Sequence, residues 1–295
     1  MLITGSGPQD RNEEVFGFPV FENLAHALAQ GGVAVLRLDD RGVGESTGDF
    51  RAATTADFAT DTEAAVQFAR SLPEVDGRRI GLIGHSEGGL VAPMVAVKDP
   101  GIAFVVLLAG PGQPIGELYL AQIELMGRAE GLPAGRVKRK VEVIRHGLAL
   151  LKAGEDLGPM EAALEACGPD CTGGPRPSAA RAEMETPWFR ALVFYDPQPT
   201  LRRLRCPVLA LGGTLDLQVP PALNLPLLRA ALSGTRATVE ELDGDNHLFQ
   251  KANTGAVSEY WLLPQELDPR VPEKILTFVR GAGASPGTVA GTGPR

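Results

Sequence analysis

The chain is poor in cysteine. Only three cysteines occur among its 295 residues, which is too few for a disulfide framework and does not allow even pairing. Cys167 and Cys171 are close enough in sequence to join locally, but unpaired thiols in a reducing compartment are the favoured interpretation. We therefore expect a cytoplasmic location for the chain as given, and a leader ahead of Met1 stays an open alternative.

Long hydrophobic runs and a surplus of positive charge are also missing. The longest apolar run covers residues 104–109, which is the length of a buried strand and too short to cross a bilayer. The formal net charge is −8, so nucleic acids and anionic membranes repel the chain on average. These absences predict no nucleic-acid partner and no membrane insertion. They favour a small-molecule partner and leave the oligomeric state open.

Short β-rich runs alternate with longer amphipathic segments along most of the chain. This alternation is typical of an α/β fold, in which a mostly parallel sheet is flanked by helices and binds ligands at the carboxyl ends of its strands. Thr54 and Asp57 have the spacing of a capping box at the start of one helical segment. The expected strands cover residues 33–38, 79–84, 104–109, 207–212 and 237–242, and the expected helices cover residues 21–30, 56–72, 88–98, 221–232 and 271–280.

One long region, residues 113–200, interrupts the alternation. It has no strand signal, and we interpret it as a helical cap inserted into a core formed by residues 1–112 and 201–280. Residues 281–295, rich in Gly, Ala, Thr and Pro, are expected to be a disordered tail. One helical face of the insertion carries Val137, Val141, Ile144, Leu148 and Leu151, and a basic cluster that we interpret as a solvated face comprises Arg136, Lys138, Arg139, Lys140 and Arg145.

A serine bounded by glycines follows the second expected strand. Residues 84–89 read GHSEGG, with Gly84 two positions before Ser86 and Gly88 two positions after it. Between a β-like run and a helical run, this spacing is typical of a nucleophile elbow, where a side chain in place of either glycine would collide with the neighbouring backbone. An ordinary glycine turn is the alternative. We favour Ser86 as a nucleophile.

His247 is the candidate base for that serine. A serine hydroxyl is a poor nucleophile until a histidine takes its proton. His247 follows the last expected strand and alone occupies the histidine place in the order serine, acid, histidine. His26 and His146 are interpreted as ordinary helical positions, and His85 as pointing away from Ser86 across the turn. A surface loop histidine is the alternative for His247.

Asp216 is the candidate acid that orients this histidine. It stands just after the strand expected at residues 207–212, and it lies between the serine and the histidine in sequence. Asp243 and Asp245 are its rivals. Each is so close to His247 that we expect it to shape the turn instead.

Two backbone N–H groups are expected to bind the oxyanion of an acyl-transfer intermediate. One belongs to Glu87, the residue after the nucleophile. The other belongs to the turn at residues 4–7, where we favour the N–H of Ser6, so the serine side chain itself matters little. A plain glycine turn is the alternative there. No metal and no organic cofactor are implied.

Several motifs resemble the α/β-hydrolase superfamily and, within it, bacterial EstD-like carboxylesterases. They are TGSGPQDR from residue 4, DRGVGESTG from residue 40, GHSEGG from residue 84, and the stretches around Asp216 and His247. The likeness covers residues 2–280. It implies the α/β-hydrolase fold, the same triad and oxyanion residues, and a structural turn with ion pairing at residues 40–42.

A further short strand is expected almost at Met1. Residues 2–4 precede the turn, against a mean strand length of about five to six residues. EstD-like proteins usually have sequence ahead of this strand, including a small domain. We therefore hypothesise that upstream residues, and with them the first strands of the fold, are missing.

Together these features predict a serine hydrolase that cleaves carboxylic esters of short to medium acyl chains through an acyl-enzyme on Ser86. A serine peptidase or an acyl thioesterase with the same triad is one alternative. A truncated, catalytically impaired hydrolase-fold protein and a non-catalytic binding protein are the others. Candidates to line an acyl pocket, although such side chains are more often plain core, are Leu118, Tyr119, Met126, Trp188 and Phe189.

Overall fold

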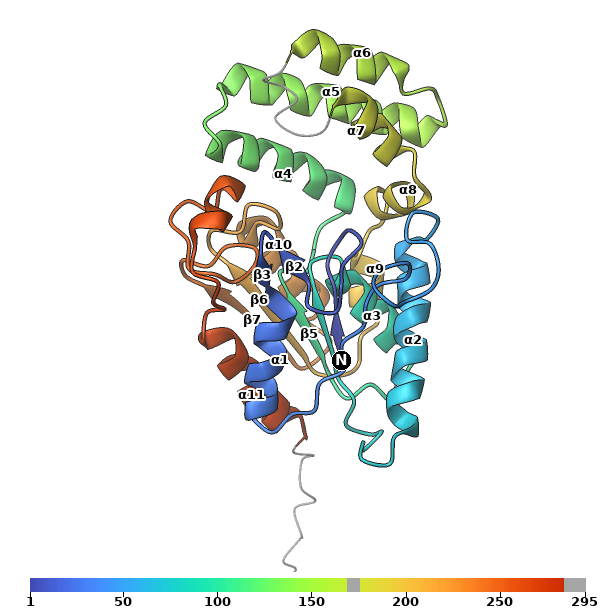
Figure 1. Cartoon of the computed structure of the whole chain (residues 1–295), viewed down its shortest axis with the longest axis vertical. Coiled ribbons are helices and arrows are strands. Elements are labelled where there is room, and N and C mark those ends of the chain that lie inside the picture. The colour runs from blue at the N-terminus through green and yellow to red at the C-terminus, as the bar shows by residue number, and fades with distance from the viewer. Residues whose placement is uncertain (169–175, 284–295) are drawn as a thin grey trace, which may run out of the picture.

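A five-stranded parallel sheet forms the centre of the protein (Figure 1). The computed structural model describes residues 1–168 and 176–283. The strands lie in the order β1-β4-β5-β6-β7, and each neighbouring pair is parallel. Their bounds are β1 (Leu2–Ile3), β4 (Leu82–His85), β5 (Val105–Leu108), β6 (Val208–Gly213) and β7 (Ala237–Leu242).

Helices cover both faces of the sheet, because successive residues of a strand point to opposite sides. Leu82 and Val105 pack with one group of helices, and their neighbours Ile83 and Val106 pack with the other. Both faces are apolar, as a parallel sheet buried on two sides requires. The first group is α2 (Thr55–Ser71), α3 (Gly88–Lys98), α9 (Gln198–Leu201) and α10 (Pro221–Ala231), and the second is α1 (Val20–Gln30) and α11 (Arg270–Gly283). The expected α/β class is confirmed.

Most elements of the core agree with the sequence-based expectations within three residues at each end. The capping box of Thr54 and Asp57 is present at the start of α2. The strand expected at residues 33–38 is wrong. β1 is only two residues long, so it offers residues 33–38 few backbone groups to pair with. The Leu2 N–H donates to the Leu36 carbonyl at 3.0 Å, but no strand forms there. Two short strands that the pattern does not indicate, β2 (Glu14–Val15) and β3 (Phe18–Pro19), form an antiparallel pair.

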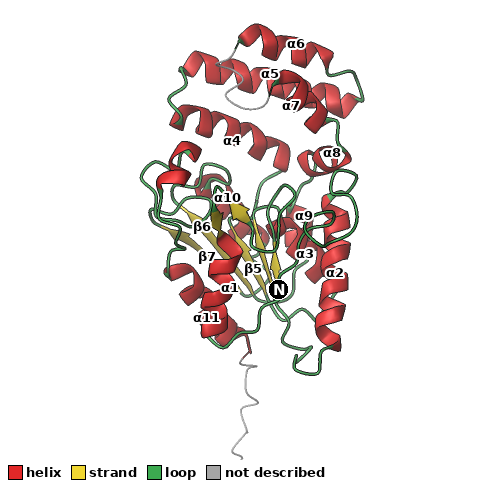
Figure 2. Ribbon diagram, viewed as in Figure 1, coloured by secondary structure: helices red, strands yellow, loops and turns green. Residues whose placement is uncertain are grey.

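In the described part of the chain, six helices lie between β5 and β6, and Figure 2 shows the first five, α4 to α8, stacked above the sheet. They have an apolar core of their own, to which Leu120, Ile144, Met160 and Met184 contribute. Their separate core supports the proposal that residues 113–200 form a cap over the core of residues 1–112 and 201–280. The helices are α4 (Ile115–Ala129), α5 (Ala134–Ala153), α6 (Gly158–Cys167), α7 (Pro177–Met184) and α8 (Pro187–Val193).

Two expectations about the ends of these segments need correction. α11 continues to Gly283, since its apolar face packs on α1, so the tail does not begin at residue 281. The rest of that stretch lies outside the described residues. Cys167, at the end of α6, is disulfide-bonded, which contradicts the interpretation of unpaired thiols; Cys171 lies outside the described residues. Across residues 1–168 and 176–283, no helix is long and apolar enough to span a membrane.

Candidate active site

Ser86 lies on a sharp turn between β4 and α3. Its φ is 51°, a left-handed conformation that residues with side chains rarely adopt. Its N–H donates to the Leu108 carbonyl at 2.9 Å, which fixes the turn against β5. A Cβ on Gly84 would come within 2.0 Å of the Gly88 carbonyl oxygen, and a Cβ on Gly88 within 2.2 Å of the Ile3 carbonyl oxygen. The turn therefore needs glycine at both positions.

We expect Gly84→Ala to lower the free energy of unfolding by about 2–4 kcal/mol, because the new methyl group meets backbone that cannot move aside. Gly135→Ala is the matched control. Gly135 lies in α5 with nothing within 4 Å of the added carbon, so the change should be neutral or stabilise by about 0.5–1 kcal/mol. Urea unfolding measures both variants. Equal midpoints for the two would contradict the tight turn.

Asp216 and His247 meet at the carboxyl ends of β6 and β7. The Nδ1 of His247 lies 2.8 Å from Oδ2 of Asp216, and both side chains are buried. The other oxygen of Asp216 accepts the backbone N–H groups of Gln218 and Val219, each at 2.8 Å. These two bonds fix the carboxylate, so the histidine Nδ1–H donates to it and Nε2 is left to act on another group.

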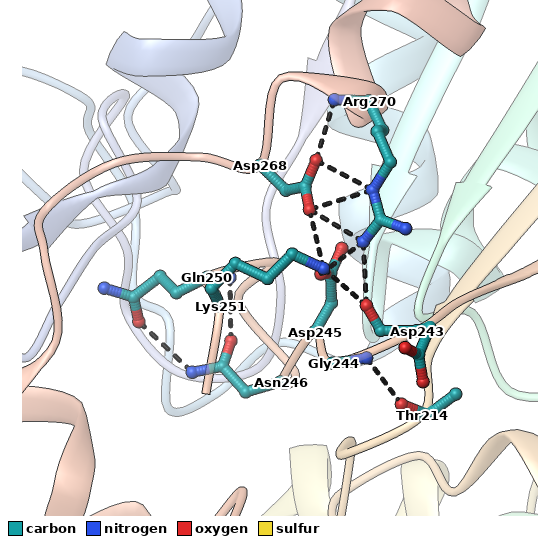
Figure 3. Close-up of polar contacts among 9 residues, drawn as sticks. All are labelled: Thr214, Asp243, Gly244, Asp245, Asn246, Gln250, Lys251, Asp268 and Arg270. Atoms are coloured by element: carbon teal, nitrogen blue, oxygen red, sulfur yellow. Dashed lines mark hydrogen bonds and ion pairs between the residues drawn. The ribbon is translucent and has the colours of Figure 1, made fainter. Parts of the chain in front are cut away.

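Asp245 belongs to a different group of charges, the ion-pair cluster of Figure 3. Its Oδ1 lies 2.8 Å from the Lys251 ammonium and 2.9 Å from the Arg270 guanidinium. Asp268 contacts the same two cations at 3.1 and 2.8 Å. The cluster ties residues 243–251, which we name the histidine loop, to the start of α11. Asp245 thus shapes this loop, as the sequence predicts for it.

We expect Arg270→Met to destabilise the protein by about 1–3 kcal/mol, toward the low end because the guanidinium is 38% exposed. Arg270 donates to both carboxylates of the cluster and to the Asp243 carbonyl. Burial raises the pKa of Asp268, but hydrogen bonds from Arg270 and Lys251 outweigh it and hold that pKa below its usual range.

The pH dependence of this loss follows from the depressed pKa of Asp268. Such a carboxylate stabilises the fold above its unfolded pKa, and the contribution fades as the pH falls through the folded value. Thermal unfolding at pH 7 should therefore separate Arg270→Met from the wild type more than at strongly acidic pH. Arg139→Met, at an exposed position of α5, is the control. A difference between wild type and Arg270→Met that grows in acid would contradict the role of the cluster.

The turn expected at residues 40–42 packs against the loop that follows β1. Asp40 accepts the Thr4 hydroxyl at 2.7 Å and the Gln9 N–H at 3.0 Å. Burial raises the pKa of Asp40 to about 6 despite these two bonds. Arg41 pairs with Asp61 at 2.7 Å. The expected ion pairing at this turn is present, and the turn supports the residue 4–7 loop.

The residue 4–7 loop carries the N–H group of Ser6 that we expect at the oxyanion hole. The N–H of Gly5 is taken, since it donates to Glu13 Oε1 at 2.6 Å. Within the described chain, no hydrogen bond engages the N–H of Ser6 or that of Glu87. Both groups that we expect at the oxyanion hole are therefore available to a ligand.

A buried pair, Glu13 and His85, lies next to these groups and was missed in the sequence. His85 Nδ1 lies 2.8 Å from Glu13 Oε1, and His85 Nε2 lies 3.0 Å from the His247 carbonyl oxygen. His85 thus faces Glu13 and the histidine loop. A search of the sequence for a histidine base sets His85 aside, and no motif connects it with a residue 72 positions away. Only the fold brings the two together.

Glu87 has a second role through its side chain. Its carboxylate accepts the Thr55 hydroxyl at 2.7 Å and the Trp188 indole N–H at 3.1 Å, so it links the elbow to α2 and to α8 of the insertion. Burial raises the pKa of Glu87, although hydrogen bonds from Thr55, Ser6 and Trp188 oppose it. The sequence shows Glu87 only as the residue after the serine.

A pocket of about 230 Å³ opens beside Ser86 and beneath the insertion. Four of the five side chains proposed for an acyl pocket line it, and Met126 does not. Among the described residues, no group of three or more His, Cys, Asp or Glu side chains is arranged to hold a metal ion. The lining from α4 and α8 is Ile115, Leu118, Tyr119, Gln122, Trp188, Phe189, Leu192 and Val193.

The fold is that of the α/β-hydrolase class, and comparison with known proteins agrees. Residues 5–259 match the alpha/beta hydrolase family, so the chain belongs to this family. The resemblance stated from the sequence motifs is confirmed.

Among curated proteins, the chain is 24% identical to esterase EstD of Thermotoga maritima over 95% of its own length and 61% of that protein. The chain thus spans about three fifths of this relative. Over a shorter stretch, 31% of each chain, it is 35% identical to the thiohydrolase apmlB of Arthrinium phaeospermum.

Solved structures of esterases and peptidases share the fold. A thermophilic esterase from Thermogutta terrifontis aligns with a TM-score of 0.54 and 20% identity over 96% of this chain and 90% of that one. Proline iminopeptidase of Mycobacterium smegmatis aligns with a TM-score of 0.55 and 18% identity over 95% and 88%. At these identities, the likeness concerns the fold.

Proposed function

We propose that the protein is a serine hydrolase that cleaves carboxylic esters through an acyl-enzyme on Ser86. The observation that carries the proposal is the buried Asp216–His247 hydrogen bond of 2.8 Å at the strand ends that also present the Ser86 turn. The match to EstD supports an ester as the substrate.

In the proposed reaction, Ser86 Oγ attacks the ester carbonyl carbon while His247 Nε2 takes its proton. Asp216 holds the ring by Nδ1 and stabilises the imidazolium. The N–H groups of Ser6 and Glu87 bind the oxyanion. When the intermediate collapses, His247 gives the proton to the departing alcohol, and the C–O bond to that alcohol breaks. Water activated by His247 then attacks the acyl-enzyme and releases the acid and Ser86.

The pocket supports a short or medium acyl chain. Its volume of about 230 Å³ is small, and apolar side chains, the largest share of them from α4 and α8, make up most of its lining. Its two carboxyl-bearing residues are Glu87 and Glu183, and burial raises the pKa of each. Uncharged acyl groups therefore fit this lining better than anionic ones.

A panel of p-nitrophenyl esters, acyl-CoA thioesters and aminoacyl amides tests the substrate class. We expect kcat/KM to be highest for esters with short or medium acyl chains. Faster turnover of amides than of esters would sink the ester proposal and favour a peptidase. Faster turnover of thioesters would favour a thioesterase; among the relatives, apmlB is a thiohydrolase.

We further propose a small-molecule ester as the partner, with no nucleic acid and no membrane insertion. The cytoplasmic location expected from the sequence stays a prediction. The bonded Cys167 does not favour it, since disulfides persist mainly in oxidising compartments. Fractionation of the cells that make the protein would decide between the cytoplasm and an oxidising compartment.

A further inference from the structure

The Glu13–His85 pair is almost completely withdrawn from water, yet the proposed acyl transfer does not use it. The side chains are 1% and 3% exposed. Glu13 has a φ of 48°, a left-handed conformation that residues with a side chain rarely adopt. Its N–H donates to the Asp10 carbonyl and its carbonyl accepts from Val20, so local hydrogen bonds hold it there. This backbone turns the carboxylate inward.

The geometry sets the charge of the pair. A neutral imidazole carries one N–H, whereas both nitrogens of His85 face acceptors, Glu13 Oε1 at 2.8 Å and the His247 carbonyl at 3.0 Å. Both contacts are hydrogen bonds only if both nitrogens carry protons. Glu13 Oε1 also accepts the Gly5 N–H, which favours the ionised carboxylate at that atom. The pair is therefore an imidazolium beside a carboxylate.

The pair connects three segments whose relative positions matter for the proposed reaction. Glu13 accepts a hydrogen bond from the N–H of Gly5, the residue before the proposed donor Ser6. His85 directly precedes Ser86 in the chain and, through Nε2, holds the main chain of His247. Three hydrogen bonds thus connect the residue 4–7 loop, the Ser86 turn and the histidine loop.

We infer that Glu13 and His85 are a positioning pair, which keeps the Ser6 N–H and His247 in register with Ser86 for as long as His85 carries both ring protons. The inference rests on the proposed serine hydrolase function. Neither side chain touches the reacting atoms in this scheme.

The pH dependence follows from the charges around the pair. Burial lowers the pKa of His85, but the charge and hydrogen bond of Glu13 outweigh it and raise that pKa above its usual value, with Asp216 adding to the effect. The His247 ring stands 4.8 Å away. Asp40 is also close to the pair, and burial together with the charges of Glu13 and Glu87 raises its pKa to about 6. A histidine with a raised folded pKa stabilises the fold below its unfolded pKa of about 6.5, and the contribution is lost as the pH rises through the folded value.

Nuclear magnetic resonance of ring nitrogens tests the charge without any substrate. The double variant His26→Gln, His146→Gln removes the two exposed histidines and leaves His85 and His247. Phosphonylation of Ser86 or pH titration distinguishes the two remaining rings. We expect two ring N–H protons on His85 at pH 7. A single ring proton on His85 would overturn the inference, whether or not the enzyme turns over.

Glu13→Gln tests the effect on the reaction. The amide oxygen can still accept from Gly5, and the amide nitrogen takes the place of Oε2. Among the described residues Oε2 has no hydrogen-bond partner, so the shape of the side chain is kept while its charge is removed. His85 should then lose its second proton near neutral pH and release one of its two contacts. We expect kcat to fall about tenfold to a hundredfold at pH 8 with KM nearly unchanged, since the oxyanion donor and the base shift relative to Ser86.

The ratio of variant to wild-type kcat should rise as the pH is lowered toward 6, where His85 regains its proton. Glu14→Gln, the exposed neighbour, removes the same charge and should keep the wild-type profile. A constant ratio across this pH range would refute the positioning role. If Glu13→Gln does not fold, the ring-proton measurement on His85 decides alone. If the wild type takes no fluorophosphonate label, the proposed function is wrong. The protonation of His85 is then still decided by the ring-proton measurement.

Discussion

Ser86→Ala should abolish ester turnover, with kcat lower by about a thousandfold to a millionfold. Ser86 has a φ of 51°, and backbone atoms pack closely against Gly84 and Gly88 on either side of it. This tight turn leaves no room for another hydroxyl to replace that of Ser86. Removing the Oγ removes the atom to which the acyl group would be bonded. Background hydrolysis assisted by the oxyanion donors is all that should remain.

The measurement combines turnover of p-nitrophenyl acetate with covalent labelling by a fluorophosphonate, followed by mass spectrometry of the labelled peptide. The wild type should gain one label on the peptide that contains Ser86, and Ser86→Ala should gain none. Ser258→Ala, at an exposed site in the 3₁₀-helix at residues 257–262, should label and turn over like the wild type. A label on Ser86→Ala, or none on the wild type, would remove Ser86 from the proposal.

The alternation of short and long apolar segments is enough to predict the core of the fold. Buried parallel strands are continuous apolar runs, and in β5 and β6 these runs end within two residues of the strand ends. The segment at residues 33–38 shows the limit of such reasoning. Its β-rich composition favours a strand, but strand pairing requires a partner, and β1 provides only two residues.

The candidate site divides in the same way. Ser86, Asp216 and His247 can be selected from the sequence because each follows a strand and their order along the chain is restricted. Glu13 cannot be selected in this way. It has no fixed spacing to Ser86 or His85, and its function depends on a loop conformation with a φ of 48° that the composition does not reveal. An interaction between charged side chains that are far apart in the sequence can be identified only from the structure.

The same limit applies to the link between the pocket and the elbow. Trp188 donates to Glu87 from 101 positions away, across the boundary between the insertion and the core. The sequence marks Trp188 as an apolar side chain that could line a pocket. Its N–H gives it a second role, because the half-buried indole donor and the buried carboxylate of Glu87 each gain a partner. The pocket proposed for the substrate and the turn of the proposed nucleophile are thus linked by hydrogen bonds at Glu87.

Asp216→Asn should lower kcat by about ten-thousandfold while the fold is kept. Two backbone N–H groups, those of Gln218 and Val219, donate to one oxygen of Asp216 at 2.8 Å each. In the variant these donors hold the amide oxygen at that place, so the amide nitrogen must face His247. Its N–H then donates to Nδ1, which forces the ring proton onto Nε2. A histidine protonated at Nε2 cannot take the proton of Ser86.

Asp243→Asn is the matched control for this variant. Asp243 is also in reach of His247 along the chain, but its side chain is exposed and its carbonyl, which the variant retains, makes its contacts with Lys251 and Arg270. Turnover by Asp243→Asn should therefore stay within about twofold of the wild type, as for most surface substitutions. Thermal unfolding should show that both variants are folded, and KM should change little in either. If Asp216→Asn keeps more than a tenth of the wild-type kcat, the buried carboxylate does not set the tautomer of His247, and the base must be oriented by the main-chain contact with His85 instead.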